Sequence, residues 1–470
     1  MFVGRVTQLS ALDSMLNRVR TKRDPKPGAA VLIRGRRRVG KSRLVEEFVS
    51  RAGLPYLFYA AAGRPVAEEL RLFANEVAAS NLPGAGTFRD VQLGSWDAAL
   101  RLLATAVGDD GCVVVFDELP YLIEKDPGFE GSLQAAFDRE LSRRRVLLVG
   151  IGSDLAMMET LDSYGRPFHQ RATEMVVPPL SPAEVGDMLD LDAAEAFDAY
   201  LITGGLPLIC DEWPTGTPMW DYLETAFNNP TSALTVSAER ALAAEFPTEA
   251  QAREVLATIG GTGERTFTTI TKRADLTAAA LTRATDILTT KRLIAAERPL
   301  SAKPSRETRY RVADPYLRFW LTFLEPNMGL IERGRGETVL ARVQASWSSW
   351  RGRAVEPVIR ESVERLTLGL GPDGASGVVG GYWTRTNDPE IDLVIADREP
   401  VAKSIFAVGS IKWLDGPFGS RDLVRLITHR GQLPGADDAT ALIVVSRAGY
   451  AAEELNGLRV LTPSDLLDGW

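Results

Sequence analysis

Histidine and cysteine are scarce in this sequence, because its 470 residues include only two of each. His169 and His429 cannot build a histidine-rich metal site, and Cys112 and Cys210 cannot form a metal cluster unaided. Both cysteines lie among apolar residues, where a thiol usually packs as a small core side chain. These shortages argue against thiol redox chemistry and against metals held by histidine or cysteine.

Long apolar runs are also missing. No uninterrupted apolar segment approaches the roughly 18 residues that a membrane-spanning helix needs. The first ten residues, MFVGRVTQLS, lack the apolar stretch of a secretory signal. We therefore expect a cytosolic protein without a membrane partner.

Positive charge is lacking overall, since the net charge is −8. This balance argues against a uniformly basic coat for nucleic acid. The charges are unevenly distributed, however: residues 261–311 contain eleven basic and five acidic side chains. Such a local basic excess in an acidic chain points to one nucleic-acid-binding region.

The strongest motif is GRRRVGKS, residues 35–42, which follows the apolar run AAVLI. It matches a Walker A loop, whose backbone N–H groups cradle phosphates while Lys41 reaches the β- and γ-phosphates and Ser42 ligates Mg²⁺. The alternative is a basic surface turn. The expected nucleotide contacts are Gly35, Arg36, Arg37, Arg38, Val39, Gly40, Lys41, Ser42 and Arg43.

A second apolar run, GCVVVFDE, ends in Asp117 and Glu118. This is a Walker B pattern, in which the first carboxylate organises magnesium and the second polarises the attacking water. A core strand leaving into a charged loop is the alternative. A further apolar strand over 146–151 precedes Ser153, which we expect to act as a polar sensor of the γ-phosphate.

Strands alternate with helical stretches over residues 1–177. This alternation predicts a parallel sheet with helices on both faces and ligands at the carboxyl ends of its strands. At about 150 residues per domain, the whole chain is long enough for about three domains. We expect a P-loop ATPase core over 1–177 and a helical lid over 178–240, in which the tetrapeptide GGLP has a structural role as a helix stop and turn.

Three helices, over 249–259, 267–273 and 277–292, precede two short strands that flank the basic hairpin RPLSAKPSRETR. This order predicts a winged helix within 241–323. Basic residues of this unit would bind DNA phosphates with salt-sensitive affinity and little sequence preference. A winged helix that binds protein is the alternative. The expected DNA contacts are Arg283, Lys291, Arg292, Lys303 and Arg306.

The remaining segment, 324–470, reads as a mixed α/β domain. Strands are expected in four places, and a helix over 420–429 lies between the third strand and the fourth. The four expected strands are 377–382, 391–396, 404–411 and 441–446.

The chain resembles the archaeal-type ATPase family, a STAND branch of the AAA+-related P-loop ATPases with kinship to origin-recognition ATPases. The resemblance is carried by FVGR (2–5), GRRRVGKS, VVVFDELPYL (113–122), LLVGIGSDLAMME (147–159) and YGR (164–166). It implies that Arg5 lies near the adenine and that Arg166 senses nucleotide. A structural salt bridge is the alternative role for Arg166.

The same resemblance implies a restriction-endonuclease-like fold for 324–470, in which an aspartate and an acid-x-lysine hold magnesium for phosphodiester attack. Asp392 and Lys412 fit two of these positions, and Glu356 matches the family's N-terminal acid. Ser410 stands where the family has glutamate, and a hydroxyl is a poor substitute for a carboxylate on Mg²⁺. Both an active nuclease and a degenerate domain retained for DNA binding or assembly are consistent with these residues.

Taken together, these motifs predict a Mg²⁺-dependent ATPase that acts as a nucleotide switch, with ATP and ADP as ligands and duplex DNA as partner. Three outputs stay open: a DNA-binding or DNA-cleaving machine, a protein assembly without DNA, and a DNA-binding ATPase whose nuclease fold is inert. The sequence also leaves a homo-oligomer open.

Overall fold

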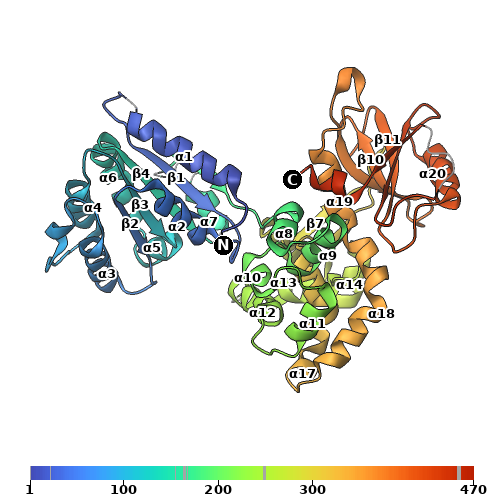
Figure 1. Cartoon of the computed structure of the whole chain (residues 1–470), viewed down its shortest axis with the longest axis horizontal. Coiled ribbons are helices and arrows are strands. Elements are labelled where there is room, and N and C mark those ends of the chain that lie inside the picture. The colour runs from blue at the N-terminus through green and yellow to red at the C-terminus, as the bar shows by residue number, and fades with distance from the viewer. Residues whose placement is uncertain are drawn as a thin grey trace. The chain divides into compact units, whose positions relative to one another are not determined.

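The computed structural model describes residues 2–21, 23–153, 155–161, 166, 168–246, 250–451 and 457–470. The chain divides into two compact units, Met1–Pro179 and Leu180–Trp470, shown in blue to teal and in green to red in Figure 1. None of the described helices is long and apolar enough to cross a membrane.

The first unit is built on a five-stranded sheet in the order β2-β3-β4-β1-β5, and every pair of neighbours is parallel. The expected parallel sheet is thus confirmed. Its central strands β3 and β4 are buried on both faces, which is why they read as continuous apolar runs. The strands are β1 (Ala29–Arg34), β2 (Tyr56–Ala60), β3 (Cys112–Asp117), β4 (Val146–Gly152) and β5 (Ala172–Val176).

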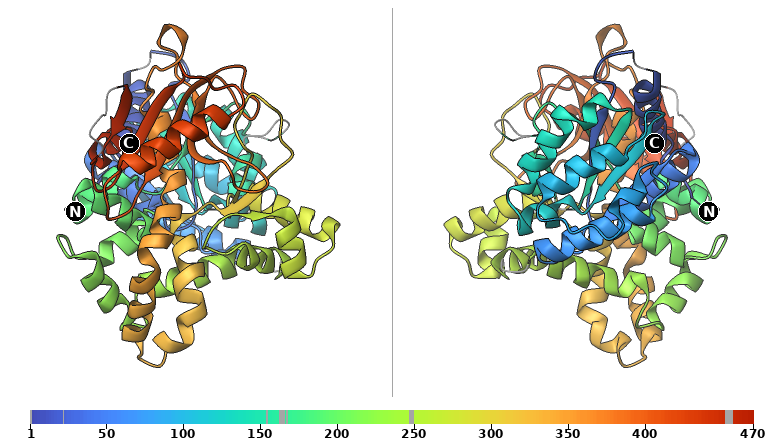
Figure 2. Two further views of the ribbon diagram at one scale, coloured as in Figure 1. Left: turned by 90° about the vertical axis from the view of Figure 1, so that its right-hand side faces the viewer. Right: turned by 90° about the vertical axis from the view of Figure 1, so that its left-hand side faces the viewer.

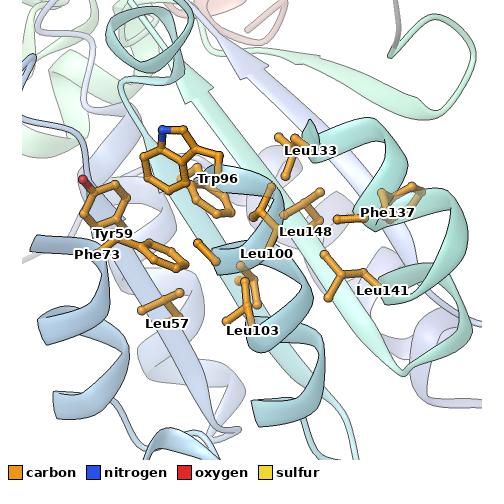
Figure 3. Packing of buried hydrophobic residues seen from close by; sticks show 14 of the residues in the cluster. Leu57, Tyr59, Phe73, Trp96, Leu100, Leu103, Leu133, Phe137, Leu141 and Leu148 are labelled. Atoms are coloured by element: carbon orange, nitrogen blue, oxygen red, sulfur yellow. The ribbon is translucent and has the colours of Figure 1, made fainter. Parts of the chain in front are cut away.

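Three helices cover one face of this sheet: α3 (Val66–Ala79), α4 (Trp96–Ala106) and α6 (Phe129–Arg139). Figure 3 shows their side chains packed on the strands around Phe73 and Trp96, whose rings meet edge to face with centroids 5.4 Å apart. Burying a side chain of this size contributes about 2 to 3 kcal/mol. The other helices of the unit are α1 (Val6–Thr21), α2 (Lys41–Ala52), α5 (Leu119–Lys125) and α7 (Leu155–Leu161), with short 3₁₀ turns at Ala85–Phe88 and Leu141–Arg143.

The second unit begins with five helices. The segment GGLP lies where the second of them ends: Gly204 has φ 59°, and a Cβ at Gly205 would lie 2.0 Å from the Leu180 carbonyl oxygen. The expected helix stop and sharp turn are therefore confirmed. The helices are α8 (Pro182–Leu189), α9 (Ala193–Thr203), α10 (Pro207–Glu212), α11 (Met219–Phe227) and α12 (Ala233–Glu245).

Three further helices and a three-stranded antiparallel sheet, in the order β6-β8-β7, follow. The helices and strands expected here are present within about two residues of their expected ends, while Glu249, where the first helix was expected to begin, lies outside the described residues. The elements are α13 (Ala250–Ile259), β6 (Arg265–Thr266), α14 (Phe267–Ala274), α15 (Ala278–Thr290), β7 (Ile294–Glu297) and β8 (Arg309–Val312).

A second five-stranded sheet, in the order β13-β12-β11-β10-β9, closes the chain; β9, β10 and β11 are antiparallel and β11, β12 and β13 parallel. Figure 2 shows this sheet in red in its left view and the first sheet in its right view. The strands are β9 (Val378–Trp383), β10 (Glu390–Ala396), β11 (Ile405–Lys412), β12 (Ala441–Ser446) and β13 (Leu458–Leu461). The helices are α16 (Pro315–Phe319), a π-turn (Trp320–Leu324), a 3₁₀ turn (Glu325–Asn327), α17 (Met328–Ile331), α18 (Gly336–Ala354), α19 (Glu356–Arg365), a 3₁₀ turn (Pro372–Gly374), α20 (Ser420–Gln432) and α21 (Pro463–Leu467).

A buried aspartate ties the first helices of this unit to its last sheet. Asp198 on α9 accepts hydrogen bonds from Arg351 at 3.0 Å, Arg447 at 2.9 Å and the Trp413 indole N–H at 3.2 Å. Burial raises the pKa of Asp198 although both arginines favour its charged form. The α9 segment and the C-terminal sheet are therefore parts of one packed body.

Candidate functional site

The loop GRRRVGKS connects β1, which ends at Arg34, to α2, which begins at Lys41. Its glycines are required by the backbone. A Cβ at Gly35 would lie 2.4 Å from the Val177 carbonyl oxygen, and Gly40 has φ 84°, which strains any residue with a side chain. The loop therefore keeps its N–H groups at the N-terminus of α2, where the helix dipole favours anions.

Lys41 is held by the loop itself. Its side chain is buried, and its Nζ donates to the carbonyl oxygens of Gly35 at 2.8 Å and Arg36 at 3.0 Å. Burial lowers the pKa of Lys41 to about 8, against the attraction of Glu118 and Asp117. An ammonium held by neutral carbonyls can exchange them for the oxygens of a polyphosphate, which carry more negative charge.

Asp117 and Ser42 meet at the carboxyl end of β3. The Asp117 carboxylate accepts a hydrogen bond from the Ser42 hydroxyl and another from the Glu118 N–H at 2.9 Å. Burial raises the pKa of Asp117, although both hydrogen bonds favour its ionised form. A hydroxyl and a carboxylate are ligands that Mg²⁺ prefers, so this pair fits the expected magnesium site.

Glu118 faces the strand next to its own. The Ser153 hydroxyl lies 3.0 and 2.9 Å from the two Glu118 carboxylate oxygens. Glu118 has φ 55° at the start of α5, a conformation that is uncommon for a residue with a side chain. Strain of this kind costs about 1 to 3 kcal/mol and is often found where function requires it.

The strand order explains why these residues meet. Strand β4 lies between β1 and β3, and the carboxyl ends of all three strands point the same way because the sheet is parallel. The structure thus gathers, at one edge of the sheet, five side chains that the sequence separates by up to 112 positions: Lys41, Ser42, Asp117, Glu118 and Ser153.

The arginines around the loop have different surroundings. Arg5 is 3% exposed and donates from Nη2 to the Val39 carbonyl oxygen at 2.8 Å, so it supports the backbone of the loop. Arg37 donates to the Tyr121 hydroxyl at 2.9 Å, and Arg43 pairs with Glu46 at 3.4 Å on the exposed face of α2. Arg38 has φ 67°. Tyr121 belongs to the quoted segment VVVFDELPYL but was not expected to contact the loop.

Arg166 has a carboxylate partner. Its Nη2 lies 2.5 Å from Glu130 Oε2, and the Glu130 side chain is only 6% exposed. Burial raises the pKa of Glu130, while the charge of Arg166 opposes that shift. The salt-bridge role that the sequence left open for Arg166 thus has a defined partner, and nucleotide sensing stays a prediction. Of the YGR segment, only Arg166 lies within the described residues.

The five residues expected to contact DNA lie on α15 and in the loops that follow it. Arg283, Arg292, Lys303 and Arg306 are exposed. Lys291 is half-buried and its ammonium lies 5.6 Å from the centre of the Phe246 ring.

The hairpin between β7 and β8 is anchored on the C-terminal sheet. The Leu300 N–H donates to the Gly381 carbonyl oxygen at 2.8 Å, and the Ala302 N–H to that of Pro434 at 3.0 Å. Leu300 is 2% exposed and belongs to the same apolar cluster as Phe418. The hairpin that was expected to be a basic wing is therefore partly a packing element, and the apolar Leu300 within this basic segment was the signal for this.

Asp392 lies directly opposite Ser410 in the paired strands β10 and β11. Its Oδ2 accepts from the Ser410 hydroxyl at 3.1 Å and from the Ile411 N–H at 2.9 Å. Burial raises the pKa of Asp392, and these two hydrogen bonds oppose the shift. The serine that replaces the family's acid is thus a partner of the aspartate.

Glu356 and Asp392 line the same cavity. Arg360 contacts both residues: its Nη2 lies 3.3 Å from Glu356 Oε2, and its Nε donates to the Asp392 carbonyl oxygen at 2.7 Å. Burial and the charge of Asp392 raise the pKa of Glu356 to about 8. Lys412 pairs instead with Asp422 at the start of α20. Arg360 was not expected here, although it stands one helical turn after Glu356.

Within the part of the chain that the structure describes, no three histidine, cysteine, aspartate or glutamate side chains are grouped closely enough to hold a metal ion. Of the three residues expected for a nuclease, the structure brings Glu356 and Asp392 together and gives Lys412 an acidic partner of its own.

Comparison with known proteins gives matches of three kinds. Residues 320–422 match the model of DUF234, archaeal and bacterial proteins of unknown function. An uncharacterized protein of Methanocaldococcus jannaschii is 24% identical over 445 residues, which are 93% of each chain. The structure is similar to a Walker-type ATPase of Pyrococcus abyssi (20% identity, TM-score 0.46, 68% of this chain and 96% of that one). It is also similar to the ORC2 protein of Aeropyrum pernix in its ADPNP–ADP complexes (15% identity, TM-score 0.44, 73% and 96%).

Proposed function

We propose that this protein is a Mg²⁺-dependent P-loop ATPase that acts as a nucleotide switch. The observation that carries the proposal is the meeting of Lys41, Ser42, Asp117, Glu118 and Ser153 at the carboxyl ends of three adjacent parallel strands. Ligands of open α/β sheets bind at this edge.

Each residue has a role that its position supports. Lys41 and the loop N–H groups bind the β- and γ-phosphates, which stabilises the charge that develops during phosphoryl transfer. Ser42 and Asp117 hold magnesium, which would neutralise phosphate charge. Glu118 orients the attacking water, and Ser153 positions Glu118 through its hydroxyl. Arg5 supports the loop through Val39.

The test is release of phosphate from ATP by the full chain. Lys41→Ala should lower the rate about 100-fold or more, because a preorganised cation at the transferred phosphate is lost. Arg51→Ala is the matched control, since this basic residue lies in the last turn of α2 and pairs with Glu47 on the exposed face of the helix. A Lys41→Ala protein that hydrolyses ATP as fast as the unmodified chain would refute the proposal.

For the output of the switch, we propose DNA binding. The elements α13, α14, α15 and the β6–β8 sheet have the order of a winged helix, and their exposed basic residues suit phosphate contacts. The C-terminal domain would be a nuclease fold without nuclease activity. This version is favoured because Asp392 is bonded to Ser410 and Lys412 to Asp422, so each has a protein partner where catalysis needs metal and substrate.

Affinity for duplex DNA at two salt concentrations tests this output. Phosphate contacts predict a steep loss of affinity with salt. Absence of binding at low salt, with and without ATP, would leave a switch that controls a protein assembly. Cleavage that disappears in Asp392→Ala and Lys412→Ala proteins would instead establish an active nuclease in spite of Ser410.

A further inference from the structure

A polar cavity of about 360 Å³ lies in the second unit, between the β6–α14 segment and the C-terminal sheet. Its wall includes Glu356 and Asp392, but the exposed basic residues expected to bind DNA, such as Arg283 and Arg306, do not line it. Six arginines do, and three of them come from β6, from the end of α18 and from the turn after β9: Arg265, Arg353 and Arg385. We call these three residues the arginine triad.

Some charged side chains of the cavity wall have a partner of opposite charge, and others do not. Arg309 pairs with Glu264 at 3.1 Å and Glu390 at 2.8 Å, and Arg360 pairs with Glu356 at 3.3 Å. Among the described residues no carboxylate pairs with any member of the arginine triad, although five carboxylates line the cavity. The wall therefore presents cationic groups whose counter-ion is not supplied by the protein.

The positive charge continues beyond the cavity. Arg273, in the last turn of α14, lies close enough to Arg265 that its charge adds to burial in lowering the pKa of Arg265. Lys272 and Arg273 are both exposed. Crowding of like charges without a partner costs free energy, and a bound anion would recover it. Because the basic residues extend past the cavity, a single small anion would satisfy only some of them.

We infer that the arginine triad binds the phosphodiester backbone of DNA and places it beside Glu356 and Asp392. Guanidinium groups suit this ligand because their planar forks bind phosphate oxygens in pairs. A cavity of about 360 Å³ is near the lower end of small-ligand pockets, so it has room for a phosphate and its sugar while the rest of the strand follows Arg273 and Lys272. This inference rests on the proposed DNA-binding function. It assigns the main DNA contact to this cavity and not to the wing, which is the hairpin between β7 and β8.

The experiment compares two triple variants of the full chain. One is Arg265→Ala, Arg353→Ala, Arg385→Ala. The control variant removes the same number of exposed basic residues from the DNA contacts that the sequence predicted, as Arg283→Ala, Lys303→Ala, Arg306→Ala. Fluorescence anisotropy with a labelled duplex and with its single strand gives affinity across a salt series. The arginine triad variant should bind about tenfold more weakly or worse, and its salt slope should fall by about 2 to 3, since each lost phosphate contact removes nearly one unit.

Several outcomes would overturn the inference. If the control variant loses as much affinity as the arginine triad variant, or more, DNA binds at the wing and the proposed function stands without this site. If poly-glutamate displaces the labelled DNA at a concentration of negative charge equal to that of the DNA, the site binds acidic peptides. If the unmodified chain binds no DNA while it still hydrolyses ATP, both this inference and the proposed DNA output fail, and the ATPase remains.

Folding of the variants is controlled separately. Arg265 is half-buried, whereas Arg353 and Arg385 are exposed. The double variant Arg353→Ala, Arg385→Ala therefore leaves the buried part of the site intact and should lower the salt slope by about 2. An unchanged slope in this double variant would refute the inference even if the triple variant proved unstable.

Discussion

The proposed nucleotide site of the first unit and the proposed nuclease-like site of the second use similar residues in different ways. In the first, Lys41 is bonded to neutral carbonyl oxygens and Glu118 to a neutral hydroxyl. In the second, Lys412 is paired with Asp422, and Glu356 with Arg360. A charge held by neutral groups can be passed to a ligand at little cost, whereas a charge held by its opposite has to be separated from it first.

This difference shows that residue types alone do not identify a working site. Both regions place carboxylates and a lysine on or beside buried strands. Their partners differ: neutral atoms hold the charges of the first site, and opposite charges hold those of the second.

The largest expected effect concerns the buried network that ties α9 to the C-terminal sheet. Asp198→Ala leaves Arg351 and Arg447 without their shared carboxylate, so the free energy of unfolding of the second unit should fall by about 3 to 5 kcal/mol. Asp415→Ala is the control, because Asp415 also contacts Arg351 but its side chain is 70% exposed. Chemical denaturation that gives equal losses for the two variants would show that the network does not hold these parts together.

The next effect separates the two sites by activity. Glu118→Gln should lower ATP hydrolysis about 100-fold while nucleotide binding persists, because the amide cannot polarise water as a carboxylate does. Asp392→Asn should leave ATP hydrolysis unchanged. Steady-state phosphate release together with fluorescent-nucleotide binding measures both. Equal activity of Glu118→Gln and the unmodified chain would remove Glu118 from its proposed role.

A third change asks whether the second site can be converted into one like the first. Ser410→Asp puts a carboxylate opposite Asp392, where like charges in a partly buried place should lower stability by about 1 to 2 kcal/mol. Mn²⁺ should then raise the melting temperature of this variant and leave that of the unmodified chain unchanged, since binding to the folded state stabilises it. Thr428→Asp, on the exposed side of α20, controls for added charge. An unchanged melting temperature of Ser410→Asp in Mn²⁺ would show that restoring the acid at position 410 is not sufficient to restore a metal site.

The sequence was sufficient for those parts of the first site that depend on local constraints. The strands β3 and β4 are buried on both faces, so they are continuous apolar runs whose ends mark Asp117 and Ser153. The loop glycines are needed wherever a backbone closes this tightly. Local pattern also located α14, α15 and four of the five strands of the C-terminal sheet to within a few residues, but it missed β13.

The partners of charged side chains could not be predicted, because they come from distant parts of the chain. Arg166 lies 36 residues from Glu130, and Asp198 lies 249 residues from Arg447. No periodicity links such positions. An aspartate between apolar residues of α9 was a usable signal for a buried ion pair, and Leu300 was one for the anchored hairpin.

The smallest expected change, for each pH unit, is a pH dependence of the stability of the two units. The pKa of Glu356 is raised from 4.5 to about 8 by burial and by Asp392, so the folded state binds more protons than the unfolded state between these values. Stability of the second unit should therefore fall as the pH rises from about 4.5 to about 8, and Glu356→Gln should flatten that slope. The pKa of Lys41 is lowered from its ordinary 10.5 to about 8, so its effect has the opposite sign and a different pH range. The stability of the first unit should rise as the pH increases from about 8 to about 10.5. Denaturation curves at a series of pH values measure both slopes, and a Glu356→Gln protein with an unchanged slope would show that Glu356 is not the source of the pH dependence.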